Sequence, residues 1–182
     1  IGFIVCLAGF IDDRINLTPS SKIILIIIPS FYLIDNGISI SNLGSYEYLG
    51  ILELGKFEIP FLLLSIGLLI NATNYIDGID GLAISIVSLF MILFEFFSSS
   101  DTNLYYLTVI MVFSILPLFY FNFKKENKVF LGDSGSLFLG ALTSIYVLKI
   151  LSQDYLIDSV YDMNKVLFVL SILFYPIVDI IR

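Results

Sequence analysis

Histidine is absent from this sequence of 182 residues, and both cysteine and charged residues are scarce. Without an imidazole, acid–base chemistry and metal binding within these residues must rely on carboxylates and amides. The one cysteine, Cys6, gives no information about disulfides, and its apolar neighbours favour a buried, unreactive thiol. Charged residues make up 14% of the chain, whereas an average soluble domain has about a quarter. An ordinary soluble domain is therefore not expected.

Hydrophobic residues, in contrast, make up 58% of the chain, and the mean hydropathy is +0.99. This composition excludes a disordered or fibrous protein and is typical of an integral membrane protein. The sequence starts at Ile1 without a preceding basic segment, and Arg182 directly follows an apolar segment. We therefore expect an internal fragment of a longer protein, with no signal peptide.

Apolar segments of membrane-spanning character recur along the chain. A hydrocarbon core about 30 Å thick needs roughly 20 helical residues. Besides five clear spans, two segments are incomplete or interrupted. Residues 1–11 resemble the end of a span, and residues 17–34 contain Pro29, which predicts a kinked span. The expected fold is all-α, a single integral membrane domain over residues 1–182 that forms a multi-pass transmembrane helical bundle. The five clearest predicted spans are residues 59–76, 82–97, 104–123, 137–151 and 166–181.

Counting these crossings places the three polar motifs of the chain, at residues 12–14, 71–81 and 122–136, on the same face of the membrane. The positive-inside rule makes that face cytoplasmic, because it carries most of the basic residues. Most acids outside the motifs fall on the other face, so the net charge of −7 does not describe the inner face. The inner face holds Arg14, Lys22, Lys124, Lys125, Lys128 and Arg182, and the outer face holds Lys56, Lys149 and Lys165.

The first polar motif is Asp12-Asp13-Arg14, at the end of the first apolar run. Unpaired carboxylates are costly inside a bilayer, so both acids should lie at its surface. Paired oxygen ligands suit Mg²⁺, with Mn²⁺ as an alternative. Taken alone, however, the motif is explained more simply by a solvated turn in which Arg14 pairs with one acid.

The second motif joins two apolar segments and has polar side chains at spacings of three: Asn71, Asn74, Asp77 and Asp80. If the helix continues, Asp77 shares a face with both Asn74 and Asp80, so these side chains point into one cleft. Gly78 and Gly81 allow close backbone approach or a positive φ. Helix capping explains one such residue but not four in register, and the full ligand pattern of a calcium loop is missing. This pattern favours a functional site.

The third motif runs from Asn122 to Ser136, with three lysines followed by Gly-Asp-Ser-Gly-Ser at the start of a span. Lysines attract phosphates, and exposed amides at a helix N-terminus bind anions. Asp133 within that turn could hold a metal ion that bridges the same phosphates. The positive-inside rule alone would also place the lysines here, and Asp133 could be a plain helix cap. A serine protease is excluded without a histidine base, and no P-loop motif is present.

These motifs leave two classes of rival function. A cation- or proton-coupled transporter would carry its acids near the middle of the bilayer on broken helices. Here the acids fall at span ends on one face, which favours an interfacial enzyme. A membrane scaffold needs no clustered carboxylates, and acids dispersed over separate helix faces would favour it.

In this order, the three motifs resemble the polyprenyl-phosphate N-acetylhexosamine-1-phosphate transferase family. The matching strings are GFIDDR at 9–14, NATNYIDGIDGLA at 71–83 and KVFLGDSGSLFLG at 128–140. The resemblance implies transfer of a sugar 1-phosphate from a UDP-N-acetylhexosamine to undecaprenyl phosphate in the inner membrane of a bacterium, with Mg²⁺ as cofactor and release of UMP. It also implies that earlier helices and a C-terminal cytoplasmic loop are missing. We also expect the lipid bilayer as a partner and no nucleic acid, while a homodimer stays an open alternative.

The resemblance also assigns roles to particular residues. Asp133 would be the Mg²⁺ ligand, and the remaining acids would be catalytic. Phosphoryl transfer relies on positioning and charge neutralisation more than on covalent help. Direct attack by the lipid phosphate needs no strong base, while a two-step route would use an aspartate such as Asp13 as nucleophile; both stay open. The predicted catalytic residues are Asp12, Asp13, Asp77 and Asp80, and the predicted substrate-binding residues are Asn74, Asn122, Lys125, Lys128 and Phe130.

Overall fold

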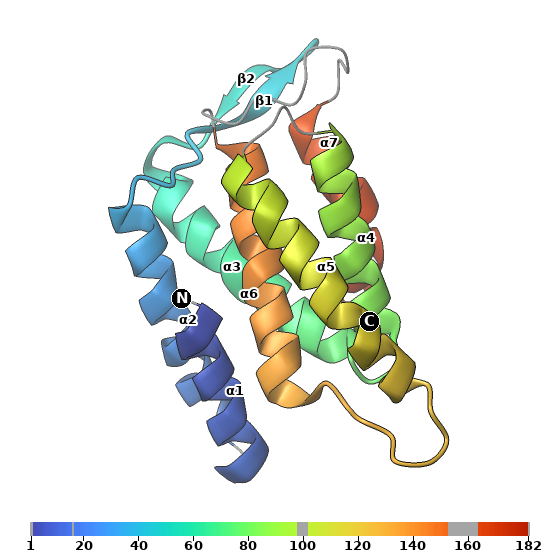
Figure 1. Cartoon of the computed structure of the whole chain (residues 1–182). Coiled ribbons are helices and arrows are strands. Elements are labelled where there is room, and N and C mark those ends of the chain that lie inside the picture. Colours follow the sequence, from blue (N-terminus) through green and yellow to red (C-terminus); the bar gives the residue numbers. More distant parts are fainter. Residues whose placement is uncertain (1, 16, 98–101, 153–163, 182) are drawn as a thin grey trace.

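The computed structural model describes residues 2–15, 17–97, 102–152 and 164–181. These residues form a helical bundle with a small β-hairpin at one end (Figure 1). The helices are α1 (Gly2–Ile15), α2 (Pro19–Asp35), α3 (Glu58–Ile76), α4 (Leu82–Phe97), α5 (Thr102–Asn122), α6 (Gly132–Leu151), α7 (Lys165–Ile172) and α8 (Phe174–Ile181), with a 3₁₀ turn at Gly55–Phe57; the strands are β1 (Asn42–Tyr46) and β2 (Gly50–Glu53).

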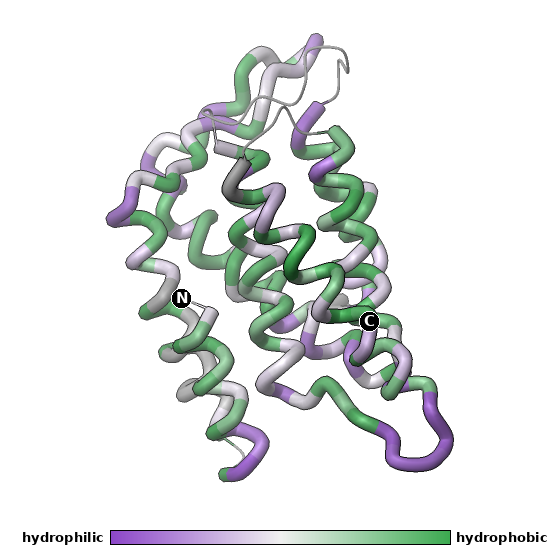
Figure 2. The backbone as a smooth tube through the Cα atoms, viewed as in Figure 1, coloured by the Kyte–Doolittle hydropathy of each residue, from purple (hydrophilic) through white to green (hydrophobic). Residues whose placement is uncertain are grey.

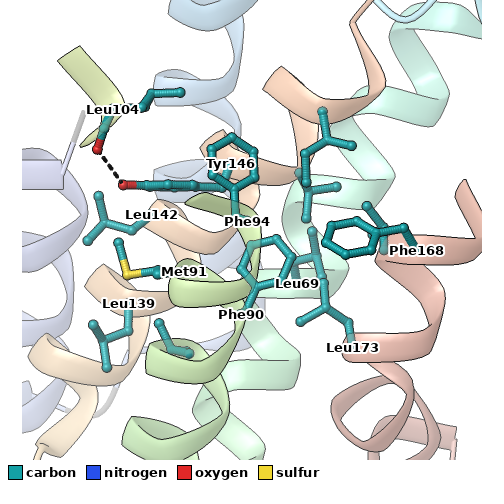
Figure 3. Close-up of a cluster of buried hydrophobic side chains, with 14 of the residues drawn as sticks. Leu69, Phe90, Met91, Phe94, Leu104, Leu139, Leu142, Tyr146, Phe168 and Leu173 are labelled. Carbon is teal, nitrogen blue, oxygen red and sulfur yellow. Dashed lines mark hydrogen bonds between the residues drawn. The ribbon is translucent and has the colours of Figure 1, made fainter. Parts of the chain in front are cut away.

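Helix α6 runs through the middle of the bundle, where it packs mainly against α1 and α3 (Figure 1). It is apolar on all sides, as expected of a helix surrounded by protein. The main core cluster packs α6 against α4 and parts of α3 and α7, with Tyr146 at its centre (Figure 3). The Tyr146 hydroxyl is satisfied by Thr108 at 2.7 Å and by the Leu104 carbonyl at 3.4 Å. Other members of this cluster are Leu69, Phe90, Met91, Phe94, Leu139, Leu142, Phe168 and Leu173.

The contact between α1 and α6 is unusually close at Gly9. A Cβ added there would lie 2.5 Å from the Asp133 carbonyl oxygen and 2.5 Å from the Ser134 Cα. Both atoms belong to the backbone, which cannot move aside as a flexible side chain could. The absence of a side chain at Gly9 therefore lets the end of α1 lie directly against the first turn of α6.

Among the described residues, three helices are long and apolar enough to cross a membrane: Gly55–Ile76, Leu104–Asn122 and Gly132–Leu151. Figure 2 shows hydrophobic residues along the helices and hydrophilic residues gathered at the two ends of the bundle. The predicted spans at 59–76, 82–97 and 104–123 agree with α3, α4 and α5 within two residues at each end. Helix α4 is apolar but has 16 residues, which is shorter than the roughly 17 to 25 residues of a membrane-spanning helix. The helical membrane character is confirmed, while the full number of crossings stays a prediction.

The prediction of a purely α-helical fold is wrong for residues 42–53. Strands β1 and β2 pair antiparallel there, with Ser45 opposite Ile51 and Tyr46 opposite Gly50. Strands of four or five residues contain too few alternations of apolar and polar positions to stand out beside long apolar helices. The hairpin caps the end of the bundle opposite to the three polar motifs (Figure 1).

The predicted span at 166–181 is divided into two helices, because α7 ends at Ile172 and α8 begins at Phe174, and its crossing of the membrane stays a prediction. Pro176 explains the break: it has no N–H to donate to the Ile172 carbonyl, and its ring clashes with that carbonyl in a continuous helix. In the predicted span at 137–151, the helix starts five residues early, so that Gly132–Ser136 is the first turn of α6. Cys6 is a free, partly buried thiol. The predicted position of Arg182 lies outside the described residues.

Candidate active site

The three polar motifs meet at one end of the bundle. The C-terminal end of α1 contacts the N-terminal turn of α6 through Asp13, and the C-terminal part of α3 reaches the same turn through Asn74. The turn between α3 and α4 is tied to the loop before α6 through Asp80 and Lys128. Residues separated by up to 121 positions in the sequence are thus in direct contact, which is the convergence that the sequence predicts.

Asp13 lies at the start of α6. Its Oδ1 accepts a hydrogen bond from the Asp133 amide at 3.0 Å, and its Oδ2 accepts from the Ser134 amide and hydroxyl, each at 3.2 Å. A carboxylate at a helix N-terminus is stabilised by the unpaired amides and by the helix dipole. Two of the amides that the sequence suggested for anion binding are therefore already bonded to a protein carboxylate.

Asp12, the neighbouring acid, points elsewhere. It is 2% exposed, and its Oδ1 accepts a hydrogen bond from the Leu17 amide at 2.8 Å in the turn between α1 and α2. The Arg14 guanidinium lies over the Phe10 ring, 4.9 Å from its centroid. The two acids thus hold different parts of the backbone, and the structure does not bring them together as a pair of metal ligands.

Asn74 connects α3 to the first turn of α6. Its Nδ2 donates to Asp133 Oδ1 and to Ser136 Oγ, both at 2.8 Å. The Ser136 side chain is fully buried and also donates to the Asp133 carbonyl at 3.4 Å. This network fixes the Asp133 carboxylate relative to α3. Asn74 thus binds Asp133 in this structure, and its contact with substrate stays a prediction.

Asp77 follows α3 directly and lies close enough to Asp133 for their charges to interact. Burial, and secondly the negative charge of Asp133, raises the pKa of Asp77 to about 6. Two carboxyl groups that disfavour each other's ionisation form an acidic site that a cation would stabilise. The helix does not continue through Asp77 as the spacing assumed; it ends at Ile76.

Asp80 therefore lies in the turn before α4, where it forms an ion pair with Lys128. The Lys128 ammonium also lies over the Phe130 ring, 4.9 Å from its centroid. Gly81 has a φ of +69°, as the sequence suggested, and a Cβ there would meet the Phe123 ring at 2.4 Å. The turn between α3 and α4 is thereby closely packed against the end of α5 and the loop that follows it.

Asn122 is buried at the end of α5. Its Nδ2 donates to the Val129 carbonyl at 3.0 Å, which folds the loop after α5 back onto the helix. Its Oδ1 is buried and has no hydrogen-bond partner within the described residues. Lys125, also predicted to bind substrate, is exposed on that loop. The exposed Lys124 lies 5.8 Å from the centroid of the Phe121 ring.

Two residues of this site were missed by the sequence reasoning, Ser134 and Ser136. Both lie in the first turn of α6 and bond to predicted site residues, Ser134 to Asp13 and Ser136 to Asn74. A signal was available, because serines beside an acid at the start of a predicted helix are typical of capping. Their partners could not be read from the sequence, since they lie on α1 and α3.

The described residues of this site offer two interacting carboxyl groups to a hard divalent cation, but not a complete set of protein ligands. Within the described part of the chain, no three acidic, histidine or cysteine side chains are grouped as a metal site. Asp133 and Asp77 form a pair of interacting carboxyl groups. Mg²⁺ is commonly held by one or two carboxylates together with substrate phosphates and water. The donor set is therefore suited to a metal ion that arrives with a phosphorylated substrate.

The position of the acids also distinguishes the rival functions. Asp13, Asp77, Asp80 and Asp133 lie at helix ends at one end of the bundle rather than in the middle of a helix. A transporter that moves cations through the bilayer would need acids along the path. A scaffold is not favoured either, because the motifs that carry these acids contact one another and are not dispersed over separate helix faces.

Comparison with known proteins agrees with this arrangement. The family model for glycosyl transferase family 4 matches residues 1–151. A protein of Bacillus subtilis named probable undecaprenyl-phosphate N-acetylglucosaminyl 1-phosphate transferase is 31% identical over 79% of this chain and 40% of its own length. Phospho-N-acetylmuramoyl-pentapeptide-transferases are 36% identical in Streptococcus agalactiae, over 74% of this chain and 43% of theirs, and 30% identical in Clostridioides difficile, over 85% and 53%.

The chain thus spans about half the length, or less, of these curated relatives. The matched residues 1–151 contain all three polar motifs and the helices α1 to α6 that bring them together. The resemblance inferred from three short strings is confirmed: the chain belongs to glycosyl transferase family 4.

Proposed function

We propose that the protein containing this chain transfers an N-acetylhexosamine 1-phosphate from a UDP-sugar to a polyprenyl phosphate such as undecaprenyl phosphate, with Mg²⁺ and with release of UMP. The observation that carries the proposal is the contact of Asp133 with Asn74 on one side and its charge interaction with Asp77 on the other. This arrangement gathers negative charge at the surface of a membrane bundle, where a lipid phosphate and a soluble nucleotide sugar can both reach it.

The pyrophosphate of the donor would bind near Asp133 and Asp77. Asp133 and Asp77 would hold Mg²⁺, which would supply positive charge to offset the charge of the phosphates. Asn74 keeps the Asp133 carboxylate oriented, because one amide group bonds to both Asp133 and Ser136. The lysines of the loop after α5 add positive charge on the same side, which attracts a phosphorylated donor.

The nucleoside end of the donor would lie toward the loop after α5. The Asn122 Oδ1 is a buried acceptor without a partner in the described residues, and leaving such a group unbonded costs about 1–3 kcal/mol. A donor N–H on a bound base would remove that cost. Phe130 is exposed, and Lys128 lies over its ring, so an aromatic base could stack on this surface.

The acceptor phosphate is itself the nucleophile in this proposal. Its ionised oxygen attacks the β-phosphorus of the UDP-sugar, the bond from that phosphorus to the bridging oxygen breaks, and UMP leaves with the electron pair. A phosphate is largely ionised near neutral pH, so the protein need not supply a strong base. We place the site at the cytoplasmic face of a bacterial inner membrane, because Arg14, Lys124, Lys125 and Lys128 lie at this end of the bundle.

The test uses the full-length protein in detergent with undecaprenyl phosphate, Mg²⁺ and a panel of UDP-N-acetylhexosamines. UMP release should require the lipid phosphate and the metal, and should identify the sugar. Mn²⁺ in place of Mg²⁺ tests the choice of metal. If folded protein releases no UMP with any sugar, the proposal fails, and cation flux in proteoliposomes becomes the next measurement.

The raised pKa of Asp77 predicts a pH-dependent stability. Because the native carboxyl binds its proton more tightly than the unfolded one, native stability falls as pH rises from 3.8 toward about 6. Asp77→Asn removes this loss. The melting temperature of the variant minus that of the wild type should therefore be larger at pH 8 than at pH 4.5, by about 2 °C after allowance for solvent screening.

Thermal unfolding of both proteins at the two pH values, without divalent cations, measures this effect. Glu47→Gln, on the exposed hairpin at the other end of the bundle, is the matched control. If the melting temperatures of Asp77→Asn and wild type differ by the same amount at both pH values, the prediction is contradicted. Millimolar Mg²⁺ should reduce the pH dependence of the wild type, because it favours the ionised carboxylate.

A further inference from the structure

The N-terminal turn of α6 lacks a cap from its own sequence. Leu131 occupies the cap position and makes no side-chain hydrogen bond. The first amides of a helix have no partner within the helix, and a capping side chain usually bonds to the second or third of them. In α6 the amides of Asp133 and Ser134 are among these first amides, since the helix begins at Gly132.

Asp13 supplies the missing cap from another helix. Its two carboxylate oxygens accept from these two amides, and Oδ2 also accepts from the Ser134 hydroxyl. The fit is close, because a Cβ added to Gly132 would lie 3.3 Å from Asp13 Oδ2. Gly9, four residues before Asp13 and one turn away in α1, lies directly against the same backbone. Together, these contacts hold α1 and the start of α6 as one unit.

The capped turn carries Asp133. The Asp133 amide is held by Asp13 and its carboxylate by Asn74. Loss of the first contact would allow the turn to shift relative to α3. Displacement by about 1 Å can reduce the rate of a positioned reaction about a hundredfold.

We propose that Asp13 is a positioning residue, which caps α6 from α1 and thereby places Asp133. The proposal deepens the function proposed above and rests on it. Both oxygens of Asp13 accept hydrogen bonds, one of them two, so this carboxylate is held firmly against the first turn of α6.

A series of substitutions at Asp13 separates this positioning role from the role of nucleophile that the sequence leaves open. Asparagine has the same shape and caps helices about as well as aspartate, whereas alanine does not cap. Asp13→Asn in the full-length protein should retain at least about a tenth of the wild-type turnover, and Asp13→Ala should lose about a hundredfold. The Mg²⁺ concentration for half-maximal rate should rise in Asp13→Ala. Asp35→Asn, an exposed acid at the end of α2, is the control.

A nucleophile would give a different result. Asp13→Asn would then be as inactive as Asp13→Ala, and neither would change the Mg²⁺ requirement. That outcome overturns the proposal. Folding of each variant is checked by its melting temperature, so that only folded protein is compared.

A double-mutant cycle in stability tests the cap without any substrate or metal. Asp13→Ala, Ser134→Ala and the double variant are unfolded thermally. Because the two side chains bond to each other, the double variant should lose less in melting temperature than the two single losses added together. Additive losses overturn the proposed cap. If the wild type releases no UMP, the proposed function fails, and this cycle still decides whether Asp13 caps α6.

Discussion

Asp133→Asn in the full-length protein should lower the rate of UMP release about 10²–10³-fold, the loss found when one charge-stabilising group is removed from an active site. The Asp133 carboxylate is held by Asn74, and its charge helps to raise the pKa of Asp77. An amide has the same shape but lacks the negative charge that would hold a cation beside the donor phosphates. The variant should therefore also need more Mg²⁺ for half-maximal rate.

The measurement is the initial rate of UMP release against Mg²⁺ concentration, for wild type and variant at saturating lipid phosphate. Asp35→Asn makes the same chemical change in an exposed acid at the opposite end of the bundle, and should leave rate and Mg²⁺ requirement unchanged. A variant at position 133 that keeps more than about a tenth of the rate, with the wild-type Mg²⁺ requirement, would show that this carboxylate does not serve the metal.

Gly9→Ala is expected to have the largest effect on stability. The added methyl group would lie 2.5 Å from two backbone atoms of α6 and 2.6 Å from a third. Overpacking of this kind costs about 1–3 kcal/mol, so the melting temperature should fall by several degrees. Because the displaced atoms belong to Asp133 and Ser134, the folded fraction should also lose turnover.

The matched control is Gly67→Ala in α3. No heavy atom lies within 4 Å of a Cβ added at Gly67, and alanine stabilises a helix interior by about 0.5–1 kcal/mol relative to glycine. Thermal unfolding should therefore show opposite shifts for the two variants. Equal shifts would mean that α1 and α6 do not approach each other as closely as the structure has them.

Much of the helical fold could be predicted from local sequence. Hydropathy located α3, α4 and α5 within two residues, because a helix in an apolar environment must be apolar over its whole length. It did not predict the division between α7 and α8, where one apolar segment contains Pro176 and forms two short helices. It also failed at the hairpin, whose strands are too short to show a clear alternation.

The candidate site shows the same division. Polar residues at the ends of apolar segments identified Asp13, Asn74, Asp77, Asp80, Asn122, Lys128 and Asp133, all of which lie at one end of the bundle. The motif pattern did not reveal that Asp12 is buried in the turn between α1 and α2 while Asp13 caps α6. Adjacent side chains of a helix point about 100° apart, so neighbours in sequence can serve different partners.

The sequence by itself determined that this protein is a helical membrane protein with its acids at helix ends, and to which family it belongs. These properties depend on composition, hydropathy and the order of short motifs, all of which are local. The tertiary structure alone decided which oxygen bonds to which amide, and therefore which acids face each other. Those contacts depend on how α1, α3 and α6 are rotated and packed, and they join residues up to 121 positions apart in the sequence.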